Sequence, residues 1–173
     1  MTHRIDFSKL SVCDALDLAI LVEEEAKDRY EELADQMTIH HNEEAARFFL
    51  RMVQIELTHE RILTNRRRAL FPNRPCVVTR AMIFDVEAPD YGDARATMTV
   101  RQALEMALGG ETKAYEFFDR ALKEVHNPEV RDFFGQLRSE EQEHQALVQA
   151  QIAKLPPEPV ITAEDVSDEP VAH

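Results

Sequence analysis

Cysteine and long hydrophobic runs are both scarce in this sequence of 173 residues. The two cysteines, Cys13 and Cys76, form no Cys-x-x-Cys pair, which argues against a disulfide scaffold, a thiol redox motif and a four-cysteine iron site. We expect a cytoplasmic protein, because a reducing compartment is the default for such cysteine usage. Nowhere do eighteen apolar residues run together, and no apolar segment follows a basic patch near residue 1, so we expect neither a membrane span nor a signal peptide.

Basic residues are also few relative to acidic ones. The chain has 20 Lys and Arg against 33 Asp and Glu, a formal net charge of -13. This balance argues against a nucleic-acid partner, because phosphate backbones need a basic face and the one basic run, residues 66–68, is short. The apolar fraction of 44% is too high for a disordered chain, and the length suits one globular domain.

Glycine and proline are clustered, which leaves room for long helices between the clusters. Helical spacing of apolar residues and N-cap signals at Ser11, Asn42, Thr99 and Asn127 predict helices over about 12–39, 43–70, 100–125 and 128–153. The predicted fold class is all-α: a four-helix bundle over residues 1–155, with one long crossover between helices two and three.

Two segments show no helical pattern. Residues 71–98 contain three prolines and a short β-prone piece at 77–79, and we predict a long crossover without a helix. Residues 156–173 contain four prolines and five acids but no Lys or Arg, which predicts a flexible acidic tail.

The two halves of the chain resemble each other. An offset of 85 positions maps Glu56 and His59 onto Glu141 and His144, and an offset of 88 maps Glu23 onto Glu111. Short connections make each helix pair antiparallel, and the long crossover permits a pseudo-twofold axis between the two hairpins. Counted from the hairpin turns, four carboxylates and two imidazoles converge at the middle of the bundle.

A buried set of this kind needs compensation for its charge. An unpaired buried carboxylate costs several kcal/mol, and two divalent cations would neutralise four of them. One Glu from each of two helices and Glu-x-x-His from each of the others is the signature of ferritin-like di-iron or di-manganese proteins. Mixed carboxylate and imidazole ligands suit iron or manganese. The alternative, a solvated acidic face on each helix, does not explain the apolar residues around these positions.

At this point the sequence resembles a known family, the rubrerythrin branch of the ferritin-like superfamily. The resemblance covers roughly residues 12–153 and rests on Glu23-Glu-Glu-Ala-Lys-Asp-Arg-Tyr30, Glu56-Leu-Thr-His59, Gly110-Glu111 and Glu141-Gln-Glu-His144. It implies two iron ions per chain, with manganese or mixed metals as alternatives, that react with hydrogen peroxide or dioxygen in a bundle that is usually a homodimer. By this likeness Glu56 and Glu141 bridge the ions, Glu23 and His59 complete one site, and Glu111 and His144 complete the other.

The sequence departs from that family in two ways. Full-length rubrerythrins carry a rubredoxin domain with two Cys-x-x-Cys pairs, which this sequence lacks, so we expect an external electron donor such as a rubredoxin-like protein. Their extra Glu, one turn after the helix-three ligand, is Ala114 here, and the symmetric position is Ala26. Six ligands without a seventh are typical of bacterioferritin-type ferroxidase centres.

Several other polar residues have two interpretations. Tyr30 faces the same way as Glu23 and either bonds a bridging carboxylate or is a core tyrosine with a satisfied hydroxyl. Its counterpart, Phe118, has no hydroxyl. We expect Glu140 to be solvated, although it lies one turn from His144 and could compete with Glu141. Further residues expected outside the ligand set are His40, His41, His126, Glu24, Glu25 and Glu143.

The function predicted from these observations is a non-haem di-iron oxidoreductase, an enzyme that reduces peroxide or dioxygen. One alternative is an iron-storage ferroxidase that delivers iron to a cage. Another is a non-catalytic helical bundle whose acidic tail recruits a partner. Metal content separates this last alternative from the others, because a purely structural bundle has no reason to hold two ions.

Overall fold

In the computed structural model, residues 5–87 and 98–157 are described, and the chain is helical throughout most of them. A short 3-10 helix, η1 (Phe7–Lys9), precedes the α-helices. These are α1 (Val12–Ile39), α2 (Glu43–Leu70), α3 (Arg80–Glu87), α4 (Val100–Glu124) and α5 (Pro128–Ile152). The predicted all-α, four-helix bundle is therefore confirmed, with the ends of the four long helices within one residue of expectation.

Each of the four long helices begins at the predicted N-cap residue. The side chains of Ser11 and Thr99 accept hydrogen bonds from the third helical residue within full capping boxes. Asn42 accepts from the amide of Ala45, and Asn127 caps α5, with Pro128 at the first helical position. Such caps satisfy amides that have no partner within the helix, and each stabilises a helix by about 1 kcal/mol.

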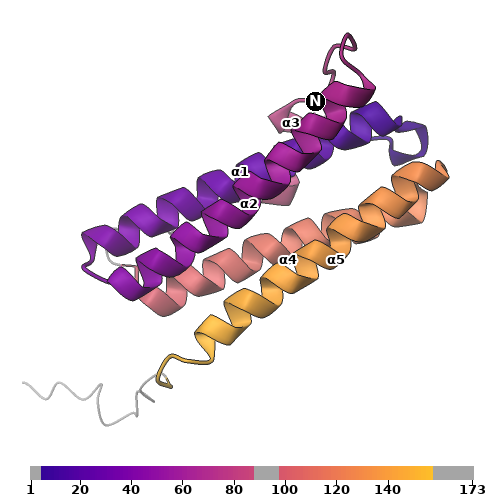
Figure 1. The fold of residues 1–173 in the computed structure, drawn as a ribbon. Helices are drawn as coiled ribbons and strands as arrows, with labels where there is room; N and C mark the ends of the chain where they lie inside the picture. Colours follow the sequence, from indigo (N-terminus) through magenta and orange to yellow (C-terminus); the bar gives the residue numbers. More distant parts are fainter. Residues whose placement is uncertain (1–4, 88–97, 158–173) are drawn as a thin grey trace, which may run out of the picture.

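The long helices form two antiparallel hairpins, α1 with α2 and α4 with α5, which lie alongside each other (Figure 1). Between the hairpins, α1 packs against both α4 and α5, and side chains of α2 also meet those of α5. The α2 helix ends at one end of the bundle, whereas α4 begins at the other end, beside the turn between α1 and α2 (Figure 1). The connection therefore runs the length of the bundle, as the single long crossover predicts.

The crossover contains a helix that the sequence did not predict. Residues 80–87 form α3, and no strand occurs at the β-prone residues 77–79. Arg80 contacts three acids of α1, with distances of 2.6 Å to Glu25, 3.2 Å to Asp28 and 3.6 Å to Glu24. An eight-residue helix is too short to be stable alone or to repeat an apolar pattern, so it depends on this docking.

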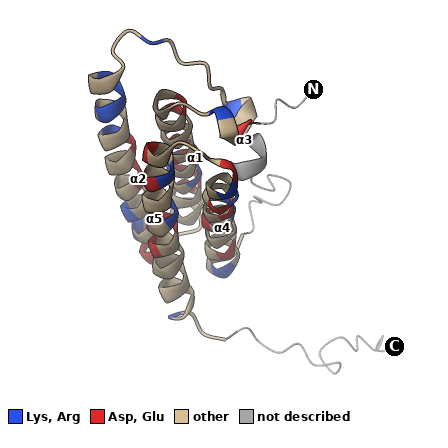
Figure 2. Ribbon diagram, turned by 90° about the vertical axis from the view of Figure 1, so that its right-hand side faces the viewer, with Lys and Arg blue, Asp and Glu red and all other residues tan. Residues whose placement is uncertain are grey.

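The basic run near residue 67 lies in the last turn of α2, where it complements the negative end of the helix dipole (Figure 2). Arg67 also donates to the carbonyls of Phe71 and Arg74, at 2.6 and 2.8 Å, and pairs with Asp17 of α1. The run therefore stabilises a helix end, as the sequence indicated. Within the described residues, no helix is long and apolar enough to cross a membrane.

The interior consists of two apolar clusters with polar residues between them. One cluster joins the first half of α1 to the second half of α4 and the first half of α5, and it includes Phe118 and Phe134. The other joins the second half of α1 to the first halves of α2 and α4, and it includes Phe49 and Leu104. Full burial of each such side chain contributes about 1.5–3 kcal/mol. The residues of the predicted site occupy the stretch between the clusters on every long helix.

Candidate metal centre

All four long helices contribute side chains to a polar layer at mid-bundle. Glu23 comes from α1, Glu56 and His59 from α2, Glu111 from α4, and Glu141 and His144 from α5. The carboxylate side chains are between 1% and 6% exposed, the His144 side chain is 5% exposed and that of His59 is 23% exposed. The structure thus brings the six predicted ligands together in one nearly dry layer.

The donor atoms fall into three overlapping groups that could each hold an ion. Within a group, one donor atom from each residue lies within 4.8 Å of the others. The groups are Glu111 with Glu141 and His144, Glu56 with His59 and His144, and Glu23 with His59 and Glu140. All six predicted ligands therefore occur in these groups. The surprise is Glu140, which was expected to be solvated.

Glu56 lies between the two imidazoles. Its Oε1 is 3.4 Å from Nδ1 of His144, and its Oε2 is 4.0 Å from Nδ1 of His59. The two histidine rings stack with centroids 5.3 Å apart and planes 15° from parallel. Each oxygen of Glu56 therefore faces a different histidine, which is the placement that a carboxylate bridging two ions requires.

Each of the remaining carboxylates lies close to one of the two histidines. Nδ1 of His59 is 3.6 Å from Oε2 of Glu23. Nδ1 of His144 is 3.3 Å from Oε2 of Glu111 and 3.7 Å from Oε2 of Glu141. Glu141 thus lies nearer the half of the site that contains Glu111.

Three buried side-chain nitrogen and oxygen atoms in this layer have no hydrogen-bond partner: Oε1 of Glu56, Nδ1 of His59 and Nδ1 of His144. A buried polar atom without a partner costs about 1–3 kcal/mol, and native proteins rarely leave several together. Cations would satisfy all three atoms at once. Oxygen and imidazole donors without a thiolate suit iron or manganese, so the residues fit the metal that the sequence predicts.

Burial makes the carboxylates hold protons when no metal is present. It raises the pKa of Glu23 to about 7 and that of Glu56 and Glu141 well above the ordinary value. Glu111 differs. Burial opposes its ionisation as well, but the nearby imidazole of His144 and the charge of Arg29 outweigh it, and the pKa of Glu111 falls below the ordinary value.

His144 carries the matching positive charge. Burial alone would lower its pKa, but the nearby carboxylates of Glu111 and Glu141 raise it to about 11. Without metal, the layer therefore holds one imidazolium and one guanidinium beside a single firmly ionised carboxylate, Glu111. Binding of divalent cations would displace protons from the other carboxyls.

Glu111 is also held from α1 by two neighbours. The hydroxyl of Tyr30 donates a hydrogen bond to its Oε1 at 2.6 Å, and Nη2 of Arg29 lies 3.4 Å from the same oxygen. Tyr30 was expected to face a bridging carboxylate if it bonded one. Its partner is instead Glu111, which the resemblance assigns to one ion only.

Sequence reasoning missed Arg29, whose side chain is 6% exposed. A signal for it exists in the paired glycines at the middle of α4. A Cβ at Gly110 would come within 2.6 Å of Nη1 of Arg29, whereas one at Gly109 would meet nothing within 4 Å. Gly110 therefore makes room for the guanidinium beside Glu111.

The two alanines singled out by sequence both face the interior. Ala26 is 6% exposed and Ala114 is 2% exposed, and Ala114 belongs to the apolar cluster that contains Phe117 and Phe118. Neither position supplies a further carboxylate to the layer. The histidines expected to lie outside the site, His40, His41 and His126, are exposed at the hairpin turns.

Known proteins resemble this chain in sequence and fold. A family model described as Rubrerythrin matches residues 14–152. The crystal structure of an uncharacterized conserved protein from Magnetospirillum magnetotacticum MS-1 is similar, with 29% sequence identity, 88% of this chain and 100% of that chain covered, and a TM-score of 0.71. Comparison with curated proteins gives no match. The family match spans all six predicted ligands, and the chain belongs to the rubrerythrin family.

Proposed function

We propose that this chain is a non-haem di-iron oxidoreductase that reduces hydrogen peroxide or dioxygen. The observation that carries the proposal is the position of Glu56, fully buried between two histidines, with one oxygen facing each ring. Glu23 and His59 would hold one ion, Glu111 and His144 would hold the other, and Glu56 and Glu141 would be shared. When bound, the iron pair would supply two electrons to the oxidant as it passes from the ferrous to the ferric state.

The chain's own residues would prepare the site for that chemistry. The two apolar clusters above and below the layer exclude water, which strengthens every charge interaction inside it. Tyr30 and Arg29 hold Glu111 ionised and fixed in orientation, so it is ready to bind a cation. Because its pKa is about 7, the Glu23 carboxyl holds a proton at lower pH and releases it when a cation binds.

A test of this proposal loads the metal-free protein with two ferrous ions per chain under anaerobic conditions. Single-turnover oxidation is then followed with peroxide and with dioxygen in parallel. Faster oxidation by peroxide supports a peroxidase. The variant Glu56→Gln is expected to lose the paired ions, and Glu31→Gln, on the exposed face of α1, serves as the control. Failure of the native chain to bind two ions would overturn the proposal.

A second candidate is a ferroxidase of the bacterioferritin type. The observation that favours it is the buried alanine at both positions where a further carboxylate would stand, Ala26 and Ala114. This candidate expects oxidation by dioxygen to match or exceed oxidation by peroxide. An iron-storage cage would elute at hundreds of kilodaltons, whereas a dimer of this 19.9 kDa chain would elute near twice that mass.

We propose a homodimer and an external electron donor as partners. Exposed apolar side chains along α2, at Leu50, Leu57 and Ile62, support self-association. The donor is proposed because two free cysteines cannot supply the four thiolates of a rubredoxin-type iron site. Size-exclusion chromatography and reduction of the oxidised protein by a rubredoxin-like protein would test the two proposals separately.

A further inference from the structure

The α5 helix presents two consecutive carboxylates to different halves of the metal layer. Consecutive residues of a helix point about 100° apart, so Glu140 and Glu141 cannot both face the same way. Glu141 groups with Glu111 and His144, whereas Glu140 groups with Glu23 and His59. The acid that sequence periodicity places at the margin of the site is therefore near the half of the site formed by the other hairpin.

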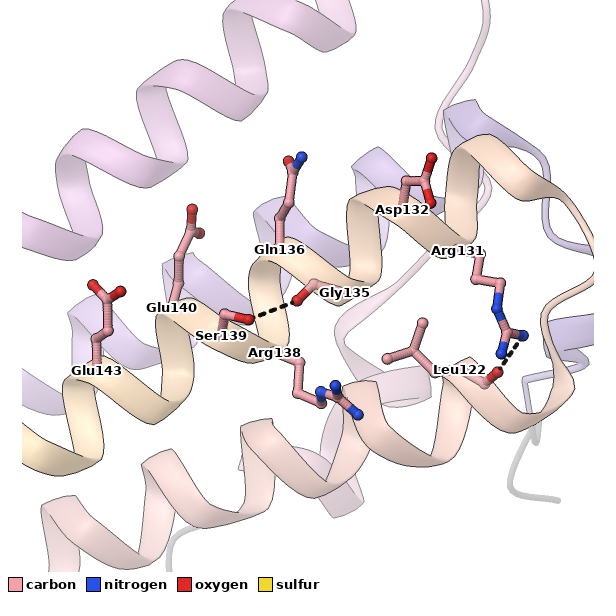
Figure 3. Close-up of a pocket in the computed structure, with 9 residues that line it drawn as sticks. All are labelled: Leu122, Arg131, Asp132, Gly135, Gln136, Arg138, Ser139, Glu140 and Glu143. Atoms are coloured by element: carbon pink, nitrogen blue, oxygen red, sulfur yellow. Dashed lines mark hydrogen bonds between the residues drawn. The ribbon is translucent and has the colours of Figure 1, made fainter.

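The direction of the Glu140 side chain agrees with this grouping. In Figure 3 the Glu140 side chain points from α5 toward α2, in the other hairpin, whereas Arg138 points toward α4. Glu140 also lines an open surface cavity of about 780 Å³ with Gln136, Ser139 and Glu143. It is half-buried, so one side of the carboxylate faces the metal layer and the other reaches solvent.

The two halves of the site need this residue unequally. Near His144 the structure places three carboxylates, from Glu56, Glu111 and Glu141, within 3.7 Å of Nδ1. Near His59 it places only Glu23, at 3.6 Å, and Glu56, at 4.0 Å, among the six predicted ligands. Glu140 supplies the third carboxylate, with its donor atom within 4.8 Å of those of Glu23 and His59.

This spacing is close to that of a coordinated ion. Ligands on opposite sides of an ion with bonds of about 2.1 Å lie roughly 4.2 Å apart, so small side-chain movements would close the group. A second observation points to a ligand at the same place. The buried Nδ1 atom of His59 lacks a hydrogen-bond partner.

We propose that Glu140 is a ligand of the metal ion held by Glu23 and His59, and thus a seventh protein ligand of the pair. This inference rests on the proposed di-metal function. It assigns to α5 the additional carboxylate that Ala26 and Ala114 do not supply. Because Glu140 also lines the surface cavity, the ion that it binds is the one nearer to solvent.

The test titrates the metal-free protein with Co²⁺ and measures stoichiometry and affinity by calorimetry. The native chain, Glu140→Gln and Glu140→Ala are compared with Glu143→Gln, which changes an exposed acid of the same helix and cavity. We expect two ions in the native chain and in Glu143→Gln. In both Glu140 variants, one ion should keep its affinity and the other should bind at least 10-fold more weakly, the lower limit found for lost supporting contacts.

Two readouts separate failure of this inference from failure of the di-metal function. The cobalt absorption spectrum of the second ion should change in the Glu140 variants, because it loses a ligand. Two ions with native affinity and spectrum in both Glu140 variants would overturn the inference while leaving the proposed function intact. Fewer than two ions in the native chain would overturn both. Thermal melts without metal should be unchanged in Glu140→Gln, because the position is half-buried.

Discussion

The hydroxyl of Tyr30, on α1, donates a 2.6 Å hydrogen bond to Oε1 of Glu111, on α4. Both residues are fully buried, so this bond links the two hairpins inside the dry part of the bundle. Phe118, the counterpart of Tyr30 in the second half of the chain, packs against Phe117 and Phe134 instead. The duplicated hairpins therefore differ in one support of the metal layer.

Tyr30→Phe should lower both stability and metal affinity. A hydrogen bond to a charged group is worth roughly 1.5–3 kcal/mol, so we expect the free energy of unfolding of the metal-free protein to fall by that amount. Affinity for the ion near His144 should fall about 10–100-fold, because Glu111 loses an orienting contact. Urea titration and calorimetry check the two effects. Tyr115→Phe, at a half-buried position of α4, is the control, and equal effects in the two variants would contradict the assigned role.

The paired glycines of α4 offer a matched test of Arg29. Gly109→Ala adds a methyl group in open space and should stabilise the helix by about 0.5–1 kcal/mol. Gly110→Ala should instead push the guanidinium of Arg29 away from Glu111, because the new Cβ would occupy its place. We expect Gly110→Ala to be less stable than Gly109→Ala by roughly 1–3 kcal/mol in denaturant titrations. Equal stabilisation by both changes would show that Arg29 moves freely.

Much of the fold follows from local sequence signals. The caps at Ser11, Asn42, Thr99 and Asn127 act within one turn of the chain, so they can be recognised without any tertiary information. The internal repeat also predicts where along the bundle the metal layer lies. Two residues that are equally many positions before and after a hairpin turn lie at the same height in the two helices. The predicted acidic tail over 156–173 lies almost wholly outside the described residues, as do positions 88–97 of the crossover.

The features that sequence reasoning missed all depend on contacts between elements. The α3 helix is held by Arg80 against the acids of α1. Glu140 was expected to be solvated, and its place near Glu23 and His59 depends on how the two hairpins pack together. A charged side chain on a long helix is usually exposed, whereas Arg29 is buried because Gly110 leaves room for its guanidinium.

The pH dependence of the metal-free protein should be unusual. Raising the pKa of Glu23 from 4.5 to about 7 means that the folded state binds more protons than the unfolded state in this range. The contribution of Glu23 to the free energy of unfolding is therefore fully present below pH 4.5. It is lost as the pH rises through 7, and the loss is roughly 3 kcal/mol. His144, with its pKa raised from 6.5 to about 11, adds a further loss above pH 6.5.

Thermal melts in the presence of a chelator, between pH 5 and 9, check this expectation. The melting temperature should fall as the pH rises, and Glu23→Gln should reduce the fall between pH 5 and 7, because it removes one of the titrating carboxyls. With metal present the trend should reverse, since metal ligands must be deprotonated to bind. A melting temperature that rises from pH 5 to 7 without metal would show that the buried carboxyls are already ionised.

Ala114→Glu tests whether a carboxylate on α4 would shift the reaction toward peroxide. Ala114 is 2% exposed within an apolar cluster, so the new acid should destabilise the metal-free protein by about 1–3 kcal/mol. Metal should restore that stability only if the new carboxylate reaches an ion. The control is Ala121→Glu, on the same face of α4 two turns further from the layer, which is also fully buried and should not be rescued.

We expect the ratio of peroxide to dioxygen oxidation rates to rise in Ala114→Glu, because the added carboxylate restores the ligand that the family carries at this position. An unchanged ratio, despite rescue by metal, would mean that the choice of oxidant is made elsewhere in the site, and Glu140 would then be the first residue to examine.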